Sequence, residues 1–296
     1  MSRIHDALKR AEQERSTSTG THVEPTFDQP ESQLDMPPLQ PQQPGVMSNM
    51  GSGFSYETLV ARCAQGAWNP DTNTMLFFSE DDSRVGAEEF RTLRSRLYQI
   101  REKMQLKNLM VTSALPKEGK SFVAANLAQV MVRQHGRRAL VIDADLRNPG
   151  MHRHLGAKQT PGLSEYLLGE CDEFAALQRG PMENLFFMPA GRVVGSAPEL
   201  LSNGRMKLLL QRVEPLFDWI IIDTSPVIPV SDSTLVANYC DGILMVVRSN
   251  VTPSDMARRA REEFPDKMLL GVVLNGTHPD GTRSKYYYGE AVTTEV

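Results

Sequence analysis

Residues 109–121 read LMVTSALPKEGKS, and this stretch decides the fold. An apolar strand over Leu109–Thr112 leads into a polar loop, and a helix begins at Ser121. That order is typical of a phosphate-binding loop, in which backbone N–H groups and the helix N-terminus hold the phosphates. The lysine of such a loop neutralises the β- and γ-phosphates, and the following hydroxyl reaches Mg²⁺. The sequence therefore places Gly119, Lys120 and Ser121 in a nucleotide site.

The loop departs from the strict pattern G-x-x-x-x-G-K-[ST] at its first position, which is Ala114. A GKS tripeptide is weak evidence on its own, because an exposed loop before an ordinary helix has the same sequence signature. If the loop binds phosphates, the residues that line it are Ala114, Pro116, Lys117, Glu118, Gly119, Lys120 and Ser121.

Short apolar runs alternate with longer helical stretches along the rest of the chain. These runs are RALVIDAD at 138–145, WIIIDTSP at 219–226, GILMVVRS at 242–249 and LLGVVLNG at 269–276. Nearly continuous apolar strands are expected where helices cover both faces of a parallel sheet. The pattern predicts an α/β fold with a doubly wound, mostly parallel sheet of the P-loop NTPase type. Residues 51–79 are predicted to lie at the domain edge, and within them residues 57–68, ETLVARCAQGAW, are predicted to be helical.

Three carboxylates follow or end the predicted strands. Asp143 and Asp145 end one run, and alternation along a strand sends their side chains to the same face. Asp223 ends a second run. Asp is also a common turn former, so each of the three alone is more often structural. Together with Lys120 they form the acidic half of a Mg²⁺–triphosphate site at the carboxyl end of the sheet.

Composition excludes several classes of protein. The 296 residues carry 32 Lys+Arg and 36 Asp+Glu, so the formal charge is 32 − 36 = −4, and a nucleic-acid partner is not expected. Three cysteines stand far apart without a CxxC pattern, which excludes a zinc cage or a disulfide framework. No apolar run reaches the roughly 18 residues that span a bilayer, and the N-terminus lacks a signal-peptide core. A cytoplasmic location is expected.

The chain divides into four predicted parts. Residues 1–15 form a short amphipathic helix, with Ile4, Ala7, Leu8 and Ala11 on one face. Residues 16–50 are rich in Pro and Gln and contain no Lys or Arg, which predicts a disordered linker. Residues 51–280 hold the nucleotide-binding domain, and residues 281–296 form a flexible tail that contains tyrosines. The terminal helix is either a frayed end without a role or a docking helix on a tether.

With these motifs in hand, the chain resembles the bacterial tyrosine kinases that regulate capsule and exopolysaccharide synthesis. SALPKEGKS, VIDADLRNP and WIIIDTSP resemble the family's Walker A, A′ and B motifs. EEFRTLRSRL carries Glu88, Arg91 and Arg94 at the spacing E-x-x-R-x-x-R, which mediates subunit contacts in a ring in that family. SKYYYGE resembles the family's tyrosine cluster and contains the expected autophosphorylation sites Tyr286, Tyr287 and Tyr288.

Two positions set the chain apart from related proteins. The family loop usually reads P-G-E-G-K, whereas Lys117 stands here in place of that glycine. A residue other than glycine is restricted in φ, so either the loop tolerates Lys117 or nucleotide binding is weaker. The partitioning ATPases have a signature lysine five residues before the loop lysine, where this chain has Leu115. That difference argues against the nearest alternative class.

The resemblance implies an ATP- and Mg²⁺-dependent tyrosine kinase that phosphorylates its own tail in a neighbouring subunit. It implies that Lys120 stabilises the transferring phosphoryl group and that Ser121 and Asp145 hold Mg²⁺. Asp143 would orient or deprotonate the attacking phenol, and Asp223 would organise the water shell of the metal. Asn275 sits where related ATPases contact the adenine base, although a turn residue before a glycine is an equal explanation.

Partners and alternatives follow from the same resemblance. The kinase is expected to form a homo-oligomeric ring and to be recruited peripherally to the inner face of the cell membrane. There it would meet a separate, membrane-embedded polysaccharide co-polymerase that acts as its activator. One alternative is a switch ATPase of the partitioning or septum-site type. The other is a non-catalytic, nucleotide-binding scaffold of a polysaccharide assembly complex.

Overall fold

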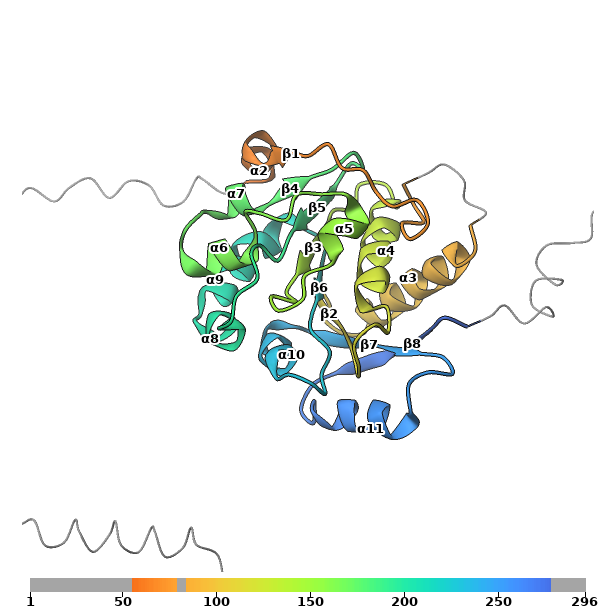
Figure 1. Ribbon diagram of the computed structural model, residues 1–296. Helices are drawn as coiled ribbons and strands as arrows, with labels where there is room; N and C mark the ends of the chain where they lie inside the picture. The colour runs from red at the N-terminus through yellow and green to blue at the C-terminus, as the bar shows by residue number, and fades with distance from the viewer. Residues whose placement is uncertain (1–54, 79–83, 278–296) are drawn as a thin grey trace, which may run out of the picture. The chain divides into compact units, whose positions relative to one another are not determined.

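A computed structural model describes residues 55–78 and 84–277, which build an eight-stranded sheet between layers of helices (Figure 1). The spatial order of the strands is β1-β4-β5-β3-β6-β2-β7-β8. Neighbouring strands are parallel except for β4 and β5. The strands are β1 Ala64–Gln65, β2 Asn108–Ser113, β3 Ala139–Asp143, β4 Gln178–Arg179, β5 Leu185–Met188, β6 Trp219–Asp223, β7 Gly242–Arg248 and β8 Leu269–Asn275. The predicted mostly parallel α/β fold is confirmed.

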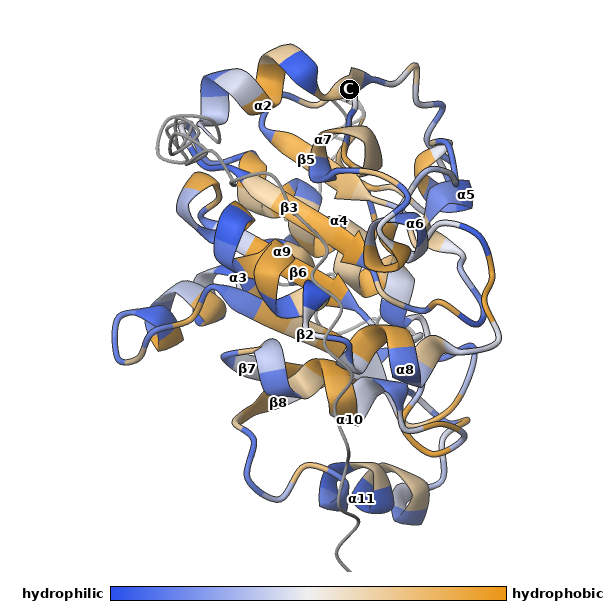
Figure 2. Ribbon diagram, turned by 90° about the vertical axis from the view of Figure 1, so that its left-hand side faces the viewer, coloured by the Kyte–Doolittle hydropathy of each residue, from blue (hydrophilic) through white to orange (hydrophobic). Residues whose placement is uncertain are grey.

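The central strands are apolar because helices cover both of their faces. Every residue of β2, β3, β5 and β6 is buried. Figure 2 shows the strands β3 and β6 in the colours of hydrophobic residues, whereas the helix α11 at the rim is largely hydrophilic. Parallel strands with two covered faces carry continuous apolar runs rather than an alternating pattern. The runs that the sequence shows are therefore the consequence of this layered packing.

The helices divide between the two faces of the sheet. On one face α3, α4 and α5 pack against β2, β3 and β6. On the other face α6, α8 and α9 cover β3, β5 and β6, while α11 covers β7. The helices are α2 Tyr56–Arg62, α3 Ala87–Arg101, α4 Lys120–Val132, α5 Met151–Leu155, α6 Leu163–Leu168, α7 Glu173–Ala176, α8 Ala197–Ser202, α9 Arg205–Val213, α10 Asp232–Val236 and α11 Ser254–Glu262.

The predicted helix over residues 57–68 is wrong in its second half. The helix α2 ends at Arg62, and Cys63 already has extended backbone angles. Ala64 and Gln65 then pair with β4 as the outermost strand of the sheet, which confirms the predicted position at the domain edge. Backbone pairing with a strand more than 110 residues away overrides the local helical pattern, because propensity is a weak preference.

Several predicted parts lie outside the described residues. These are the helix over 1–15, the linker over 16–50, the tail over 281–296 and the tyrosines Tyr286, Tyr287 and Tyr288. Within the described part of the chain, no helix is long and apolar enough to cross a membrane.

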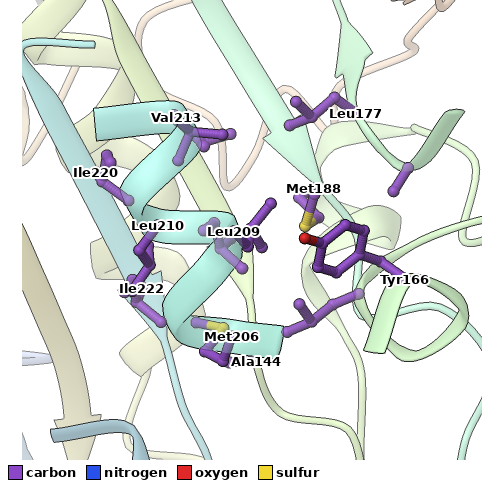
Figure 3. Close-up of a cluster of buried hydrophobic side chains, with 14 of the residues drawn as sticks. Ala144, Tyr166, Leu177, Met188, Met206, Leu209, Leu210, Val213, Ile220 and Ile222 are labelled. Carbon is purple, nitrogen blue, oxygen red and sulfur yellow. The ribbon is translucent and has the colours of Figure 1, made fainter. Parts of the chain in front are cut away.

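The helix α9 shows how the helical layer is held to the sheet. Met206, Leu209, Leu210 and Val213 recur at the spacing of one helical face and are buried. Figure 3 shows these side chains between Ile220 and Ile222 of β6 on one side and Tyr166 and Met188 on the other. The adjacent Leu208 points away from this cluster and is 47% exposed, whereas Leu209 is fully buried.

This contrast predicts a large difference between two neighbouring substitutions. Leu209→Ala should lower the free energy of unfolding by about 2–5 kcal/mol, because it leaves a cavity in the core. Leu208→Ala makes the same change of helix propensity at an exposed position and should change it by about 0.5 kcal/mol or less. Urea denaturation of both variants measures the difference. Equal losses would contradict the packing of α9 described above.

Candidate functional site

The loop over residues 114–119 connects the central strand β2 to the helix α4. Strand β2 lies between β6 and β7, and the chain crosses from it to β3 on the far side of β6. Ligands of open α/β sheets bind at the carboxyl ends of the strands, where such crossovers diverge. Lys120 is the first residue of α4, and Gly119 before it has a left-handed φ of 96°. The loop thus ends at a helix N-terminus, where N–H groups and the helix dipole favour anions.

Lys120 reaches two of the three carboxylates that the sequence singled out. Its Nζ lies 2.9 Å from Asp145 Oδ2 and 3.6 Å from Asp223 Oδ2. The hydroxyl of Ser121 donates to Asp223 Oδ2 at 2.5 Å. Asp143 and Asp223 are direct neighbours in the register of β3 and β6. The structure therefore brings Lys120, Ser121 and the three carboxylates together, as their order along the chain predicts.

Burial and charge act in opposite directions on these groups. Burial lowers the pKa of Lys120, but the Asp223 and Asp145 carboxylates outweigh this effect, and the net pKa lies above its ordinary value. Burial raises the pKa of Asp143, and the negative charge of Asp223 raises it further. The pKa of Asp223 is also raised by burial, against the lowering effects of Lys120 and Ser121. One ammonium among three buried carboxylates leaves the site short of positive charge.

Asp143 is held by the backbone that follows it. Its Oδ1 accepts the N–H of Asp145 at 3.1 Å, and its Oδ2 accepts the N–H groups of Gly150 at 3.3 Å and Met151 at 3.2 Å. The side chain is fully buried. These contacts fold residues 144–151 into a fixed turn that carries Asp145 toward Lys120. Asp143 therefore shapes the site, and its role toward a phenol stays a prediction.

A pair that the sequence analysis missed fixes the same turn from outside. Arg147 donates from Nε to Asp232 Oδ2 at 2.6 Å and from Nη2 to Asp232 Oδ1 at 3.1 Å. Asp232 begins α10 and is almost completely buried. A bidentate pair of this kind is strong and directional. It joins the turn after β3 to the segment after β6, and only the proximity of Arg147 to Asp145 in the sequence hints at it.

The side chains of the loop itself divide into exposed and buried ones. Pro116 and Lys117 are exposed, whereas Ala114 and Glu118 are buried. The Glu118 carboxylate accepts the N–H of Leu115 at 2.6 Å and contacts the hydroxyl of Thr252. Ala114 and Glu118 can therefore meet a phosphate only through their backbone. Phosphate contacts of the predicted loop residues stay a prediction.

Lys117 adopts the conformation for which a glycine is suited. Its φ is +66°, in the left-handed region that costs an L-residue about 1–2 kcal/mol. The loop therefore takes a left-handed turn at Lys117 in spite of the missing glycine, and its effect on nucleotide binding stays a prediction. The strain is a property of the folded loop and is offset by contacts elsewhere.

Asn275, the predicted adenine contact, lies against the loop. Its Nδ2 donates to the carbonyl of Glu118 at 2.9 Å, and its Oδ1 accepts the N–H of Gly276 at 2.9 Å. The side chain is thus engaged with the protein on both sides of its amide. The contact with a base stays a prediction.

The motif on α3 is separate from this site. Arg91 donates to Glu88 at 3.0 Å, as the i, i+3 spacing predicts. Arg94 donates to the carbonyl of Val130 on α4 at 3.0 Å. Phe90 and Leu97 of the same helix are buried in the core. The role of these charged residues in a subunit interface stays a prediction.

Comparison with known proteins gives the site its context. The chain is 35% identical over 207 residues to the tyrosine-protein kinase YwqD of Bacillus subtilis, which is 69% of this chain and 87% of that relative. It is 34% identical over 196 residues, 64% of this chain, to the succinoglycan biosynthesis transport protein ExoP of Rhizobium meliloti, but spans 25% of its length. No model of a known protein family matches the chain.

A solved structure agrees with these sequence relatives. The kinase domain of the Escherichia coli tyrosine kinase ETK superposes with a TM-score of 0.62 at 31% identity, over 71% of this chain and 83% of that one. These similarities favour the kinase interpretation over a switch ATPase of the partitioning type.

The strained loop predicts an order of stability at residue 117. Lys117→Gly removes the left-handed strain of about 1–2 kcal/mol and adds about 0.5–1 kcal/mol of chain entropy, so the free energy of unfolding should rise by about 0.5 kcal/mol. Lys117→Val should lower it, because a β-branched residue tolerates positive φ poorly. Urea denaturation establishes the order Gly, Lys, Val.

Lys103 provides a matched control for this series. It is exposed and is not among the described residues with positive φ. Lys103→Gly should therefore gain no stability. A stabilising effect there, or a Lys117→Val variant as stable as the parent, would contradict the strained loop.

Proposed function

This chain belongs to the bacterial tyrosine-protein kinases, and we propose that the site around Lys120 transfers the γ-phosphoryl group of ATP to tyrosines of its own C-terminal segment. The observation that carries the proposal is the Lys120 ammonium at the N-terminus of α4, 2.9 Å from Asp145 and 3.6 Å from Asp223. A loop lysine beside strand-end carboxylates supplies the charge stabilisation and the metal ligands on which phosphoryl transfer depends. The proposed biological role is regulation of exopolysaccharide or capsule synthesis.

Each residue of the site has a separate role in the proposed phosphoryl transfer. Lys120 turns from its carboxylates toward the γ-phosphate and stabilises the charge on the phosphoryl oxygens. The phenol oxygen of a tyrosine forms the new bond to phosphorus, and the bond from phosphorus to the β-phosphate oxygen breaks to release ADP. The phenol proton passes to a carboxylate of the Asp143 and Asp145 pair. Positioning and charge carry most of this chemistry, so no covalent enzyme intermediate is required.

The carboxylates also fit Mg²⁺. Asp223 Oδ1 is buried and has no hydrogen-bond partner in the described part of the chain. Ser121 and Asp145, the predicted ligands, lie within reach of the same ammonium. Over residues 55–78 and 84–277, no group of three or more His, Cys, Asp or Glu residues is arranged to hold a metal. Mg²⁺ is usually bound by one or two carboxylates together with phosphates and water. Bound Mg²⁺ would neutralise charge between the β- and γ-phosphates.

The proposed assembly is a ring in which one subunit phosphorylates the tail of the next. Glu88, Arg91 and Arg94 of α3 are proposed to form the contact between subunits. Glu88 is largely exposed, with 67% of its side chain accessible, and so is available to a neighbour. Arg94 already binds α4 within its own chain, so an interface there would also depend on the packing of α3 on α4.

The proposed setting is the inner face of the cell membrane, beside a separate, membrane-embedded polysaccharide co-polymerase that acts as an activator. One relative bears the name of a succinoglycan biosynthesis transport protein and is about four times as long as the matched part. A longer relative that joins a domain of this kind to further sequence, and whose name refers to polysaccharide transport, supports a role beside a polysaccharide-transport machinery. Residues 1–15 and 16–50 are proposed to tether the kinase to that partner.

A substitution of Lys120 distinguishes a kinase from a non-catalytic scaffold, because only a kinase forms phosphotyrosine that depends on this lysine. Lys120→Met should reduce phosphotyrosine formation by about 100-fold or more, because it removes the charge that opposes the developing phosphoryl charge. Incubation with γ-labelled ATP measures the effect. Lys207→Met changes an exposed lysine on α9 and should have no effect. Equal labelling of both variants, or no labelling of the parent chain with its activator present, would contradict the kinase.

Mixing two full-length variants, each unable to phosphorylate itself, tests the acceptor tyrosines and the transfer between subunits. The Lys120→Met chain keeps its tyrosines, and a second chain with Tyr286, Tyr287 and Tyr288 changed to Phe keeps its kinase site. When the two are mixed with labelled ATP, the label should appear on the Lys120→Met chain alone, because only that chain carries acceptors. Separation of the two chains by size tags shows where the label lies.

One further mixture and two contrary outcomes complete this test. Arg91→Ala in both chains should lower the transfer if α3 forms the subunit contact. Label that stays on the Phe-substituted chain would place the acceptors elsewhere. A mixture that gives no label, while the unmodified chain labels itself, would show that transfer occurs within one chain.

A further inference from the structure

Two side chains from the ends of neighbouring strands bind consecutive carbonyls of the phosphate loop. Arg248, the last residue of β7, donates from Nη1 to the carbonyl of Lys117 at 3.2 Å. Asn275, the last residue of β8, donates from Nδ2 to the carbonyl of Glu118 at 2.9 Å. Arg248 and Asn275 are paired in the sheet register, and the N–H of Ser249 donates to the carbonyl of Asn275 at 2.8 Å. The two donors therefore stand side by side on a rigid support.

The side chain of Glu118 also ties the loop to the segment that follows β7. The Glu118 carboxylate is buried and contacts the hydroxyl of Thr252, in the turn that follows β7. The N–H of Arg248 also donates to the Thr252 hydroxyl oxygen at 3.1 Å. Charged side chains are rarely buried without such partners. Side chain and backbone of Glu118 thus both tie the loop to the carboxyl ends of β7 and β8.

Gly119 shows how closely Asn275 approaches. A Cβ at Gly119 would lie 2.0 Å from Asn275 Nδ2, so the amide lies directly on the glycine that precedes Lys120. The backbone on the other side of Glu118 is the left-handed Lys117. The two donors therefore bind the loop on either side of Glu118, next to the left-handed Lys117.

We propose that Arg248 and Asn275 are positioning residues for ATP, which hold the loop carbonyls so that Lys117 keeps the left-handed conformation a glycine would adopt freely. Without the two hydrogen bonds, Lys117 would relax from its positive φ at little cost. The loop backbone would then change course, and Gly119 and Lys120 would no longer be held in place at the start of α4. The inference rests on the proposed function, because it concerns the phosphate loop of that site. It assigns Asn275 to the loop backbone rather than to the adenine base.

Binding of two ligands to the full chain tests the inference. The probes are a non-hydrolysable ATP analogue and inorganic triphosphate, which has no base, and calorimetry gives their dissociation constants. Asn275→Ala should weaken both ligands by a similar factor of about 3 to 10, the value of one hydrogen bond. Arg248→Ala should weaken both by a smaller factor, because its guanidinium is exposed. In the kinase assay KM for ATP should rise while kcat changes little.

Lys117→Gly supplies the rescue that a merely structural role would not show. In that background Asn275→Ala should weaken the analogue less than about twofold, because a glycine needs no support at positive φ. Asn203→Ala is the matched control. The side-chain amide of Asn203 also donates a hydrogen bond to a backbone carbonyl, that of Leu167 at 3.0 Å, but away from the site. It should leave both dissociation constants unchanged.

Each result decides between the possibilities. A loss confined to the ATP analogue would show a contact with the base and would overturn the inference. An equal loss that Lys117→Gly does not reduce would overturn it as well. Arg248→Ala leaves the core intact and gives an independent measurement if Asn275→Ala unfolds in a thermal scan. A parent chain that binds neither ligand would overturn the proposed function, whereas normal binding with unaffected variants would overturn this inference alone.

Discussion

The contact between Lys120 and the carboxylates at the ends of β3 and β6 governs the geometry of this end of the sheet. Asp143, Asp145 and Asp223 are all buried, and burial of an uncompensated carboxylate is costly. The ammonium of Lys120 supplies the charge for Asp145 and Asp223, while three backbone N–H groups serve Asp143. The start of α4 and the turn after β3 therefore cannot move independently.

The sequence predicts the centre of this fold well because the signal and the structure have the same cause. Strands β3 and β6 are apolar throughout since helices cover both faces, and each ends in a carboxylate. The edge of the sheet is harder to predict. Strands β1 and β4 are only two residues long and are defined by their backbone pairing with neighbouring strands, which leaves no pattern in the sequence. Strand β5, LFFM, is only four residues long, and short apolar runs of this kind do not distinguish strand from helix.

The candidate site divides in the same way. Residues that belong to a sequence motif, such as Lys120, Ser121 and Asp223, can be assigned to the site from the order and spacing of the motifs. Residues whose role depends on a contact far along the chain cannot. Glu118 meets Thr252, 134 residues further along the chain, and its burial is invisible in the sequence PKEGK. Only the fold brings the end of β7 to the loop.

Lys117 shows how a local rule is overridden. Sequence reasoning identifies the missing glycine and leaves open whether the loop adapts or binding weakens. The structure keeps the left-handed backbone and places donors from β7 and β8 on the adjoining carbonyls. A residue can occupy an unfavourable region of φ when its surroundings determine its position more strongly than its own preference.

The charge balance at Lys120 also couples the metal to the nucleotide. Its ammonium lies 2.9 Å from Asp145, and in the proposed reaction it would turn toward the γ-phosphate. When Lys120 turns to the phosphate, Asp223 loses the cation that lowers its pKa while its burial persists. The unpartnered Asp223 Oδ1 would then be free to accept from the water shell of Mg²⁺, which Ser121 and Asp145 are proposed to hold. On this proposal Lys120 supplies the positive charge of the site until ATP and Mg²⁺ bind, and each is expected to bind more tightly in the presence of the other.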